Sequence, residues 1–341
     1  MIPGRLPDSA AAGAVDLDGG DEPCRRRRTT LARMPITLDL SFLGRAHVIA
    51  TAALPCDGGV ALVDPGPSSC LPALTAALAA HGYALTDVKA LLLTHIHLDH
   101  AGAAGSIVQQ LPDVPVYVHA VGARHLIAPE KLLASATRLY GADMNRLWGA
   151  FLAVPEANVR ALTGGETITP GGLSLAVAST PGHAVHHVSY LDAADGIAYV
   201  GDTAGIAIGG YALAATPPPD VDLGAWMQSL DAIDEWAPRA LFLTHFGEVA
   251  EARAHLARYR QVLLRSAERV RTDVARGGDE RALIEGWVQW LRADARAALS
   301  EADAQAVEVA APFDQIWQGL ARYWRKRAER DGAAAIATPF G

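Results

Sequence analysis

Cysteine is scarce in this chain, with only Cys24, Cys56 and Cys70 among 341 residues. An odd number of cysteines without metal-type spacing argues against a disulfide framework. The same scarcity fits a reducing compartment, so we expect a cytoplasmic protein.

Long apolar runs and excess positive charge are also lacking. No stretch approaches the roughly 18 consecutive apolar residues that a membrane-spanning helix needs. The basic cluster Arg25–Arg28 is followed by Thr29–Met34, which has no apolar core of the kind that a secretion signal carries. The formal net charge of −8 gives a surface that does not attract a polyanion. We therefore expect neither a membrane nor a nucleic-acid partner.

Apolar residues make up 50% of the chain and charged residues 19%, which is typical of a soluble globular protein with a sizeable core. Residues 1–33 lack apolar periodicity and are predicted to be a disordered extension. Short β-rich runs dominate the middle of the chain, and the composition becomes helical after residue 248. Strands are predicted at 36–40, 47–52, 59–64, 88–93, 114–119, 173–178, 187–191, 196–200 and 240–244. Helices are predicted at 69–81, from about 101, at 122–148, 249–271, 280–299 and 312–330, with a loop at 205–219.

The densest polar stretch is Thr94–His100, where His95, His97, Asp99 and His100 follow a predicted strand. Imidazole and carboxylate groups are first-row metal ligands, and packing four together is costly unless a cation offsets their desolvation. A lone His-x-His pair would indicate only a solvated turn. The full His-x-His-x-Asp-His run predicts half of a metal site.

Further polar residues stand beside the ends of later predicted strands. His183 follows a Pro-Gly pair, Asp202 follows a glycine, and His245 follows a threonine. A sheet can present side chains in such places at one edge, so we expect these three to complete the site.

In order and placement, these motifs resemble those of the metallo-β-lactamase-fold superfamily from about Val48 to His245. That family carries a His-x-His-x-Asp-His loop, a later His after Pro-Gly, an Asp after Gly and a final His. The resemblance implies an α/β (α+β) protein, an αββα four-layer sandwich with a C-terminal helical extension. It implies a catalytic domain over 34–250, a C-terminal helical region over 251–330 and a tail over 331–341.

The resemblance also implies two divalent metal ions. The implied ligands are His95, His97 and His183 on the first ion, Asp99, His100 and His245 on the second, and Asp202 between the two. Zinc is the expected metal, with iron or manganese as alternatives, because histidine and carboxylate suit all three. Two cations on one water lower its pKa, so a metal-bridging hydroxide becomes the nucleophile, and Asp99 and Asp202 are the candidate catalytic residues.

The residue at position 202 narrows the range of reactions that the resemblance implies. Family members that hydrolyse β-lactams usually lack this bridging carboxylate, whereas glyoxalase II-like thioesterases, lactonases and phosphoesterases use it. We therefore predict a hydrolase acting on a small-molecule thioester, lactone or phosphoester. Lactonases of the family carry a Tyr three residues after the Asp, where this chain has Gly205, so Tyr140 and Tyr211 are the candidates for that role. His187 is a candidate to orient a metal ligand.

Two other functions stay open from the sequence. Persulfide dioxygenases of the family hold a single iron, which here would be bound by His95, His183 and Asp202, but the retention of every ligand for a second metal favours the hydrolase. A non-catalytic metal-binding module is the third reading, because metal ligands alone can stabilise a fold. A homo-oligomer is left open. His186 is predicted to be a surface histidine or a satisfied core histidine.

Overall fold

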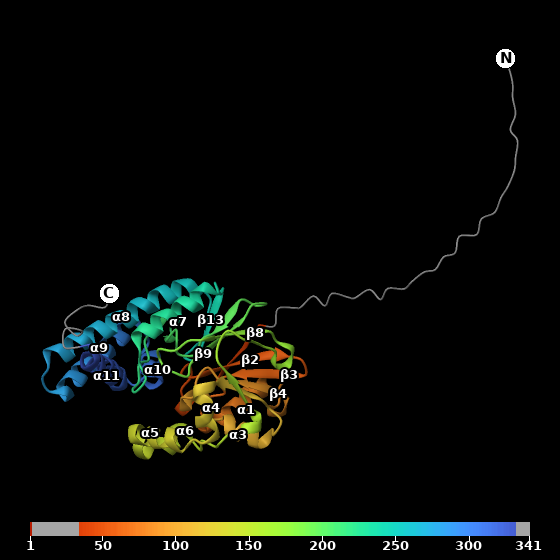
Figure 1. The fold of residues 1–341 in the computed structure, drawn as a ribbon, viewed down its shortest axis with the longest axis horizontal. Helices are drawn as coiled ribbons and strands as arrows, with labels where there is room; N and C mark the ends of the chain where they lie inside the picture. The colour runs from red at the N-terminus through yellow and green to blue at the C-terminus, as the bar shows by residue number, and fades with distance from the viewer. Residues whose placement is uncertain (2–33, 332–341) are drawn as a thin grey trace. The chain divides into compact units, whose positions relative to one another are not determined.

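The computed structural model of the protein describes residues 34–331 and Met1. Apart from Met1 and Asp331, our predictions of a disordered 1–33 extension and a 331–341 tail lie outside the described residues. Two six-stranded sheets pack face to face, and helices lie on their outer faces (Figure 1). The predicted αββα four-layer fold is confirmed.

The first sheet has the strand order β1-β2-β3-β4-β5-β6. Its members are β1 (Ile36–Asp39), β2 (Ala50–Cys56), β3 (Gly59–Val63), β4 (Val88–Leu92), β5 (Val116–His119) and β6 (Val159–Leu162). The strands β1 to β3 are antiparallel neighbours, and β3 to β6 are parallel neighbours.

The second sheet has the strand order β14-β13-β10-β9-β8-β7. Its members are β7 (Thr167–Ile168), β8 (Leu175–Ser179), β9 (Val188–Asp192), β10 (Ile197–Tyr199), β13 (Ala240–Leu243) and β14 (Gly247–Val249). Because β10 and β13 pair in parallel, their carboxyl ends lie at the same edge of this sheet.

Alternation along β3 explains why its run is apolar throughout. Ala61 and Val63 belong to the core between the two sheets, whereas Val60 and Leu62 belong to the core under the helices. A strand that is buried on both faces needs apolar residues at every position. The inter-sheet core also contains Tyr190 of β9.

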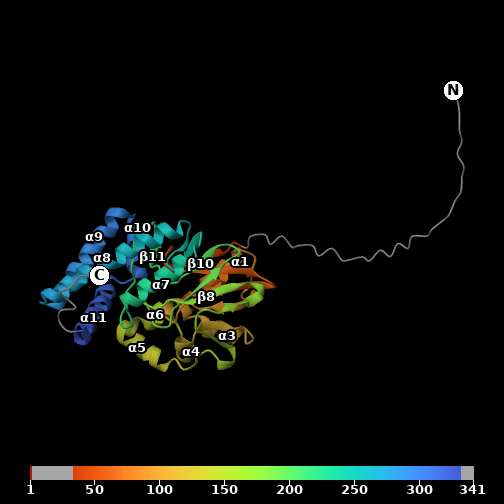
Figure 2. The ribbon, with the colours of Figure 1, turned by 45° about the horizontal axis from the view of Figure 1, so that its top comes forward.

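Helices complete the outer layers (Figures 1 and 2). They are α1 (Leu71–Ala80), α2 (Leu98–Ala101), α3 (Ala104–Gln110), α4 (Ala120–Ile127), α7 (Leu223–Glu235), α8 (Ala252–Arg276), α9 (Glu280–Ala298), α10 (Glu301–Ala310) and α11 (Phe313–Asp331). The helices α8, α9 and α11 pack together into the C-terminal helical region, where Trp287, Trp317 and Trp324 are buried. None of the helices in the described part of the chain has the length and apolarity needed to cross a membrane.

Two sequence predictions were wrong in detail. The single helix predicted over 122–148 is three helices, α4, α5 (Glu130–Tyr140) and α6 (Met144–Trp148). Pro129 precedes α5, and Gly141, with a φ of 53°, follows it, and both residue types interrupt helices.

The predicted 205–219 loop contains a hairpin of β11 (Ile206–Ile208) and β12 (Tyr211–Leu213). The intervening Gly209 and Gly210 both have positive φ, at 56° and 80°, which is the requirement of a two-residue type I′ turn. The Gly-Gly pair between alternating residues was the signal for this hairpin. Helices α7 and α10 were also not predicted.

Candidate metal centre

The seven predicted metal ligands converge at one edge of the two sheets. His95 and His97 lie between β4 and α2, and Asp99 and His100 lie in α2. The other three follow strands of the second sheet: His183 comes after β8, Asp202 after β10 and His245 after β13. Three sets of their donor atoms lie within 4.8 Å of one another: His95, His97 and His183; His95, His100 and Asp202; and Asp99, His100 and His245.

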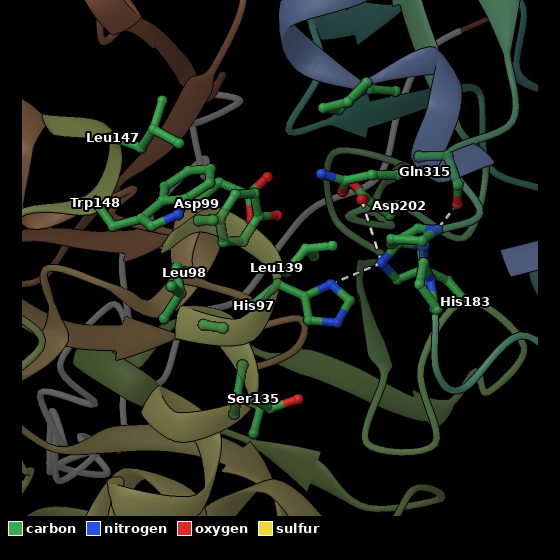
Figure 3. Close-up of a pocket in the computed structure, with 18 of the residues that line it drawn as sticks. His97, Leu98, Asp99, Ser135, Leu139, Leu147, Trp148, His183, Asp202 and Gln315 are labelled. Carbon is green, nitrogen blue, oxygen red and sulfur yellow. Dashed lines mark hydrogen bonds and ion pairs between the residues drawn. The ribbon is translucent and has the colours of Figure 1, made fainter. Parts of the chain in front are cut away.

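Three ring nitrogens meet in the first set. His97 Nδ1 lies 2.9 Å from His95 Nε2. It also lies 2.9 Å from His183 Nε2 (Figure 3). The outer nitrogen of His183 donates to the carbonyl oxygen of Ala215 at 2.9 Å, which leaves a lone pair on Nε2. Thr94 donates its hydroxyl proton to Asp64 at 2.7 Å, so its oxygen is free to accept from His95 Nδ1 at 3.1 Å. The lone pairs on His95 Nε2 and His183 Nε2 are therefore both directed into the space beside His97 Nδ1.

The second set is oriented from outside in the same manner. His245 Nδ1 donates to the carbonyl oxygen of Val48 at 2.7 Å, and His100 Nδ1 lies 2.7 Å from Asp64 Oδ2. The Nε2 atom of His245 then faces Asp99 Oδ2 at 3.4 Å. Hydrogen bonds of this kind fix the ring tautomer and direct Nε2 towards a cation.

Asp202 lies between the two sets, with one oxygen towards each. Its Oδ2 is 3.4 Å from His183 Nε2, and its Oδ1 is 3.4 Å from His100 Nε2 and 3.6 Å from His245 Nε2. This is the arrangement expected of a carboxylate that bridges two cations.

Two buried atoms of the cluster support a bound metal. His100 Nε2 and Asp202 Oδ1 are buried and have no hydrogen-bond partner within the described residues. Burying polar atoms without partners is costly, and a divalent cation would satisfy both. The donor set of imidazoles and carboxylates fits zinc, iron or manganese.

Two imidazoles and a carboxylate of the cluster have the charge states that a cation needs. Burial, reinforced by the neighbouring imidazoles, holds the pKa of His95 and that of His97 well below the usual value, so both rings are neutral and able to bind metal. Burial alone would raise the pKa of Asp99, but the facing His100 and His245 outweigh it and lower that pKa to about 2. Asp99 is therefore ionised at neutral pH. For His100, by contrast, burial would lower the pKa, but the facing Asp202, Asp99 and Asp64 outweigh it and raise that pKa well above its usual value.

Asp64 is a buried residue of the centre that the sequence analysis did not identify. Its Oδ1 accepts from the Thr94 N–H at 2.8 Å. Its Oδ2 accepts from the hydroxyls of Thr94 and Thr244, at 2.7 and 2.8 Å, and contacts His100 Nδ1. The carboxylate is fully buried and thereby connects the ends of β3, β4 and β13. Asp64 is the last residue of the predicted 59–64 strand, so its place at a strand end was a partial signal, but its partners are distant in the sequence.

His187 lies behind Asp202. Its Nε2 accepts a hydrogen bond from the Asp202 main-chain N–H at 3.3 Å, and its Nδ1 faces the hydroxyls of Thr180 and Thr203 at 2.9 and 3.1 Å. This contact orients the backbone of a predicted metal ligand.

The residue before Asp202 has to be glycine. Gly201 has a φ of 47°, and a Cβ atom there would lie 2.4 Å from Thr94 Oγ1 and 2.8 Å from His187 Nε2. We expect Gly201→Ala to lower the free energy of unfolding by about 1–3 kcal/mol, the usual effect of overpacking a core. Thermal unfolding measures this, with Gly210→Ala as the control, because φ is also positive there but nothing lies within 4 Å of the added Cβ. Equal destabilisation by both variants would contradict the steric argument.

The two candidate tyrosines lie in different places. Tyr140 borders the cavity above the cluster, and its ring packs edge-on to Trp148 with centroids 5.1 Å apart. Tyr211 does not border this cavity, contrary to our prediction. Its hydroxyl donates to Asp294 of α9 at 2.6 Å, and it borders a separate cavity beside α8 and α9. The β11–β12 hairpin, which we had predicted as a loop, is what turns Tyr211 towards those helices.

A cavity of about 610 Å³ opens over the cluster. His97, Asp99, His183, Asp202 and His245 form its floor. Its walls come from α4 to α6, from residues 215–220 and from residues 308–316.

Two buried polar residues of this cavity were also missed. His186 is not a surface or satisfied histidine as predicted, because it is buried, borders the cavity and leaves Nδ1 without a hydrogen-bond partner among the described residues. Burial lowers the pKa of His186 to about 3, with help from His183, so its ring is neutral. Trp148 Nε1 is a second buried atom of the lining without a partner there.

Several known proteins resemble this chain in sequence. A family model described as the metallo-beta-lactamase superfamily matches residues 56–245. The chain is 30% identical over 170 residues to the metallo-beta-lactamase fold-containing protein ST1585 of Sulfurisphaera tokodaii, a match that covers 49% of this chain and 63% of that protein. It is 33% identical over 166 residues to a hydroxyacylglutathione hydrolase of Xanthomonas campestris, covering 49% of this chain and 50% of that enzyme. The chain thus spans about half to two thirds of the length of these relatives.

Solved structures agree on the fold. ST1585 from Sulfolobus tokodaii superposes with a TM-score of 0.60 at 20% identity, over 85% of this chain and 99% of that one. The family protein TTHA1429 from Thermus thermophilus superposes with a TM-score of 0.62 at 21% identity, over 87% of this chain and 93% of that one. The family model spans more than half of the chain and includes all seven converging residues. The chain belongs to the metallo-beta-lactamase superfamily.

Proposed function

We propose that this chain is a metal-dependent hydrolase that holds two divalent cations, zinc in the first instance, and cleaves an ester-like bond of a small molecule. The observation that carries the proposal is Asp202, whose two oxygens face two separate sets of donors. A single-iron oxygenase would need only His95, His183 and Asp202, and it would leave the second set without a role.

The metal pair, when bound, supplies Lewis acidity and lowers the pKa of water to near neutrality. Hydrolysis breaks the bond between the acyl carbon or phosphorus and the leaving oxygen or sulfur. The hydroxyl of water ends on the acyl carbon or phosphorus, and the proton ends on the leaving atom.

Asp99 is positioned to orient the attacking water. Its side chain is about one-fifth exposed and borders the cavity, whereas Asp202 is almost fully buried. Because its low pKa keeps it ionised, Asp99 can accept a hydrogen bond from the attacking water at Oδ2 and orient it towards the substrate.

Among ester-like bonds, we propose a thioester first. The relatives of Xanthomonas campestris and Rhodopseudomonas palustris that match about half of their own lengths are named hydroxyacylglutathione hydrolases. The cytoplasmic location inferred from the cysteines fits a substrate that carries a thiol ester.

The test is a panel of thioesters, lactones and phosphoesters offered to protein of known metal content. We expect about two metal ions per chain, turnover of at least one class, loss of turnover on chelation and its return when zinc is added back. Unchanged turnover by metal-free protein would contradict the proposal. A protein that binds two metals, melts earlier on chelation and turns over nothing would instead be a metal-binding module.

A further inference from the structure

One wall of the cavity is made by α5, a helix at the margin of the core. In α5, the residues that face the cavity recur at the spacing of one helical face: Leu132, Ser135, Ala136, Leu139 and Tyr140. None of the residues of α5 is buried. Leu132, Ala136 and Tyr140 of this face pack at the margin of the core but are only partly buried. An amphipathic helix normally buries its apolar face fully, so part of the apolar face of α5 is left towards the cavity.

Exposed large apolar residues gather at the same cavity. Six are found in the described part of the chain, and two of them are Met1 and Met34. The other four all border the cavity: Leu43, Val121, Leu139 and Val185, which are 40%, 37%, 37% and 50% exposed. Contiguous apolar surface that is left in contact with water is typical of a binding site.

The cationic side chains of the cavity lie at its outside. Its cations, Arg124, Lys131 and Arg146, are all exposed, and Glu308 is paired with Arg292. No Lys, Arg or Glu in the described lining is buried. The interior therefore offers no fixed cation for a carboxylate near the reacting bond, whereas residues such as Phe42, Ile96 and Ile316 give it apolar walls.

We infer that the cavity takes the acyl part of the substrate, and that this part is an apolar chain of medium length. The inference rests on the proposed hydrolase function, because the scissile bond must lie over the floor of metal-binding residues. The apolar chain then runs between α5 and the 308–316 segment. Ser135 and Leu139 lie on the His97 side of the cavity (Figure 3). A cavity of about 610 Å³ is within the range of roughly 300–1,000 Å³ of pockets that enclose small ligands.

The experiment is a chain-length series on metal-loaded protein, with acetyl, butyryl, hexanoyl and octanoyl thioesters of N-acetylcysteamine and the matching p-nitrophenyl esters. We expect kcat/KM to rise about threefold to fourfold per methylene, the factor given by burying one methylene, until the cavity is full. A flat profile, or a preference for acetyl or hydroxyacyl groups, would overturn the inference while leaving the hydrolase intact. No turnover of any member, together with none in the wider panel, would count against the proposed function itself.

A pair of substitutions on α5 links the preference to this wall. Ala136→Trp fills the cavity, whereas Ala134→Trp puts the same side chain on the exposed face of the same helix. We expect Ala136→Trp to lower kcat/KM for the octanoyl substrate at least tenfold more than for the acetyl substrate, and Ala134→Trp to change neither. Leu139→Asn, at an exposed position, should weaken the octanoyl preference in the same direction without loss of folding. Equal losses on acetyl and octanoyl substrates in both cavity variants would show that α5 does not contact the acyl chain.

Discussion

Asp202→Asn is expected to lower kcat on the order of a thousandfold, because it removes negative charge from the residue that faces both sets of donors. A cation that is misplaced or lost forfeits several kcal/mol of transition-state stabilisation, and each 1.36 kcal/mol is tenfold in rate. The variant keeps the shape of the side chain, so the fold should persist. Kinetics on the best substrate of the panel, together with metal analysis, measures the effect.

The chain offers a matched control for this substitution. Asp220 also borders the cavity, but it is outside the three donor sets. Asp220→Asn makes the same chemical change and should leave kcat within about threefold, since it touches no cation. Equal losses in both variants would mean that general charge in the cavity matters, rather than the bridging position.

Asp64→Asn is expected to weaken metal binding by about 10–100-fold, although Asp64 belongs to none of the three donor sets. The carboxylate faces hydrogen-bond donors with both oxygens, and the amide of Asn has only one acceptor oxygen. Whichever way that amide is turned, its NH₂ group meets at least one of Thr94, Thr244 and His100. Competition with a coloured chelator measures the affinity for zinc.

Thr51→Val is the control for Asp64. Thr51 donates its hydroxyl proton to the main-chain oxygen of Asp64 at 2.8 Å, so its loss disturbs the same residue without touching the carboxylate. We expect some loss of stability and no change in zinc affinity beyond about twofold. A Thr51→Val protein that loses zinc as readily as Asp64→Asn would show that the position of the backbone, rather than the carboxylate, matters.

The local part of the metal centre could be predicted from the sequence because it is contiguous. His95 to His100 form a motif within six positions, and His183, Asp202 and His245 stand beside the ends of readable strands. Asp64 could not be assigned in that way, since its partners Thr94, His100 and Thr244 are 30, 36 and 180 residues away. Only the packing of the two sheets brings those strand ends together.

The layers of the fold were equally beyond local reasoning. Apolar runs such as 59–63 predict buried strands, but which residues face the second sheet depends on a partner more than 100 residues later, such as Tyr190. The cavity shows the same limit. Helical spacing in 130–140 identifies an apolar face, but whether that face meets a core or a cavity is decided by the C-terminal segment 308–316. The division into domains at residue 250 stays a prediction.

Because α5 has no fully buried residues, substitutions in it affect folding less than substitutions at the metal centre do. The metal-binding side chains stand at strand ends whose residues also hold the core, so most substitutions there endanger folding and chemistry together. Substitutions on the cavity face of α5 would alter the proposed acyl site at less expense to the core, because the residues of that face are only partly buried at its margin. The range of accepted substrates could then change by mutation on one helix without a change in the proposed reaction or in the fold.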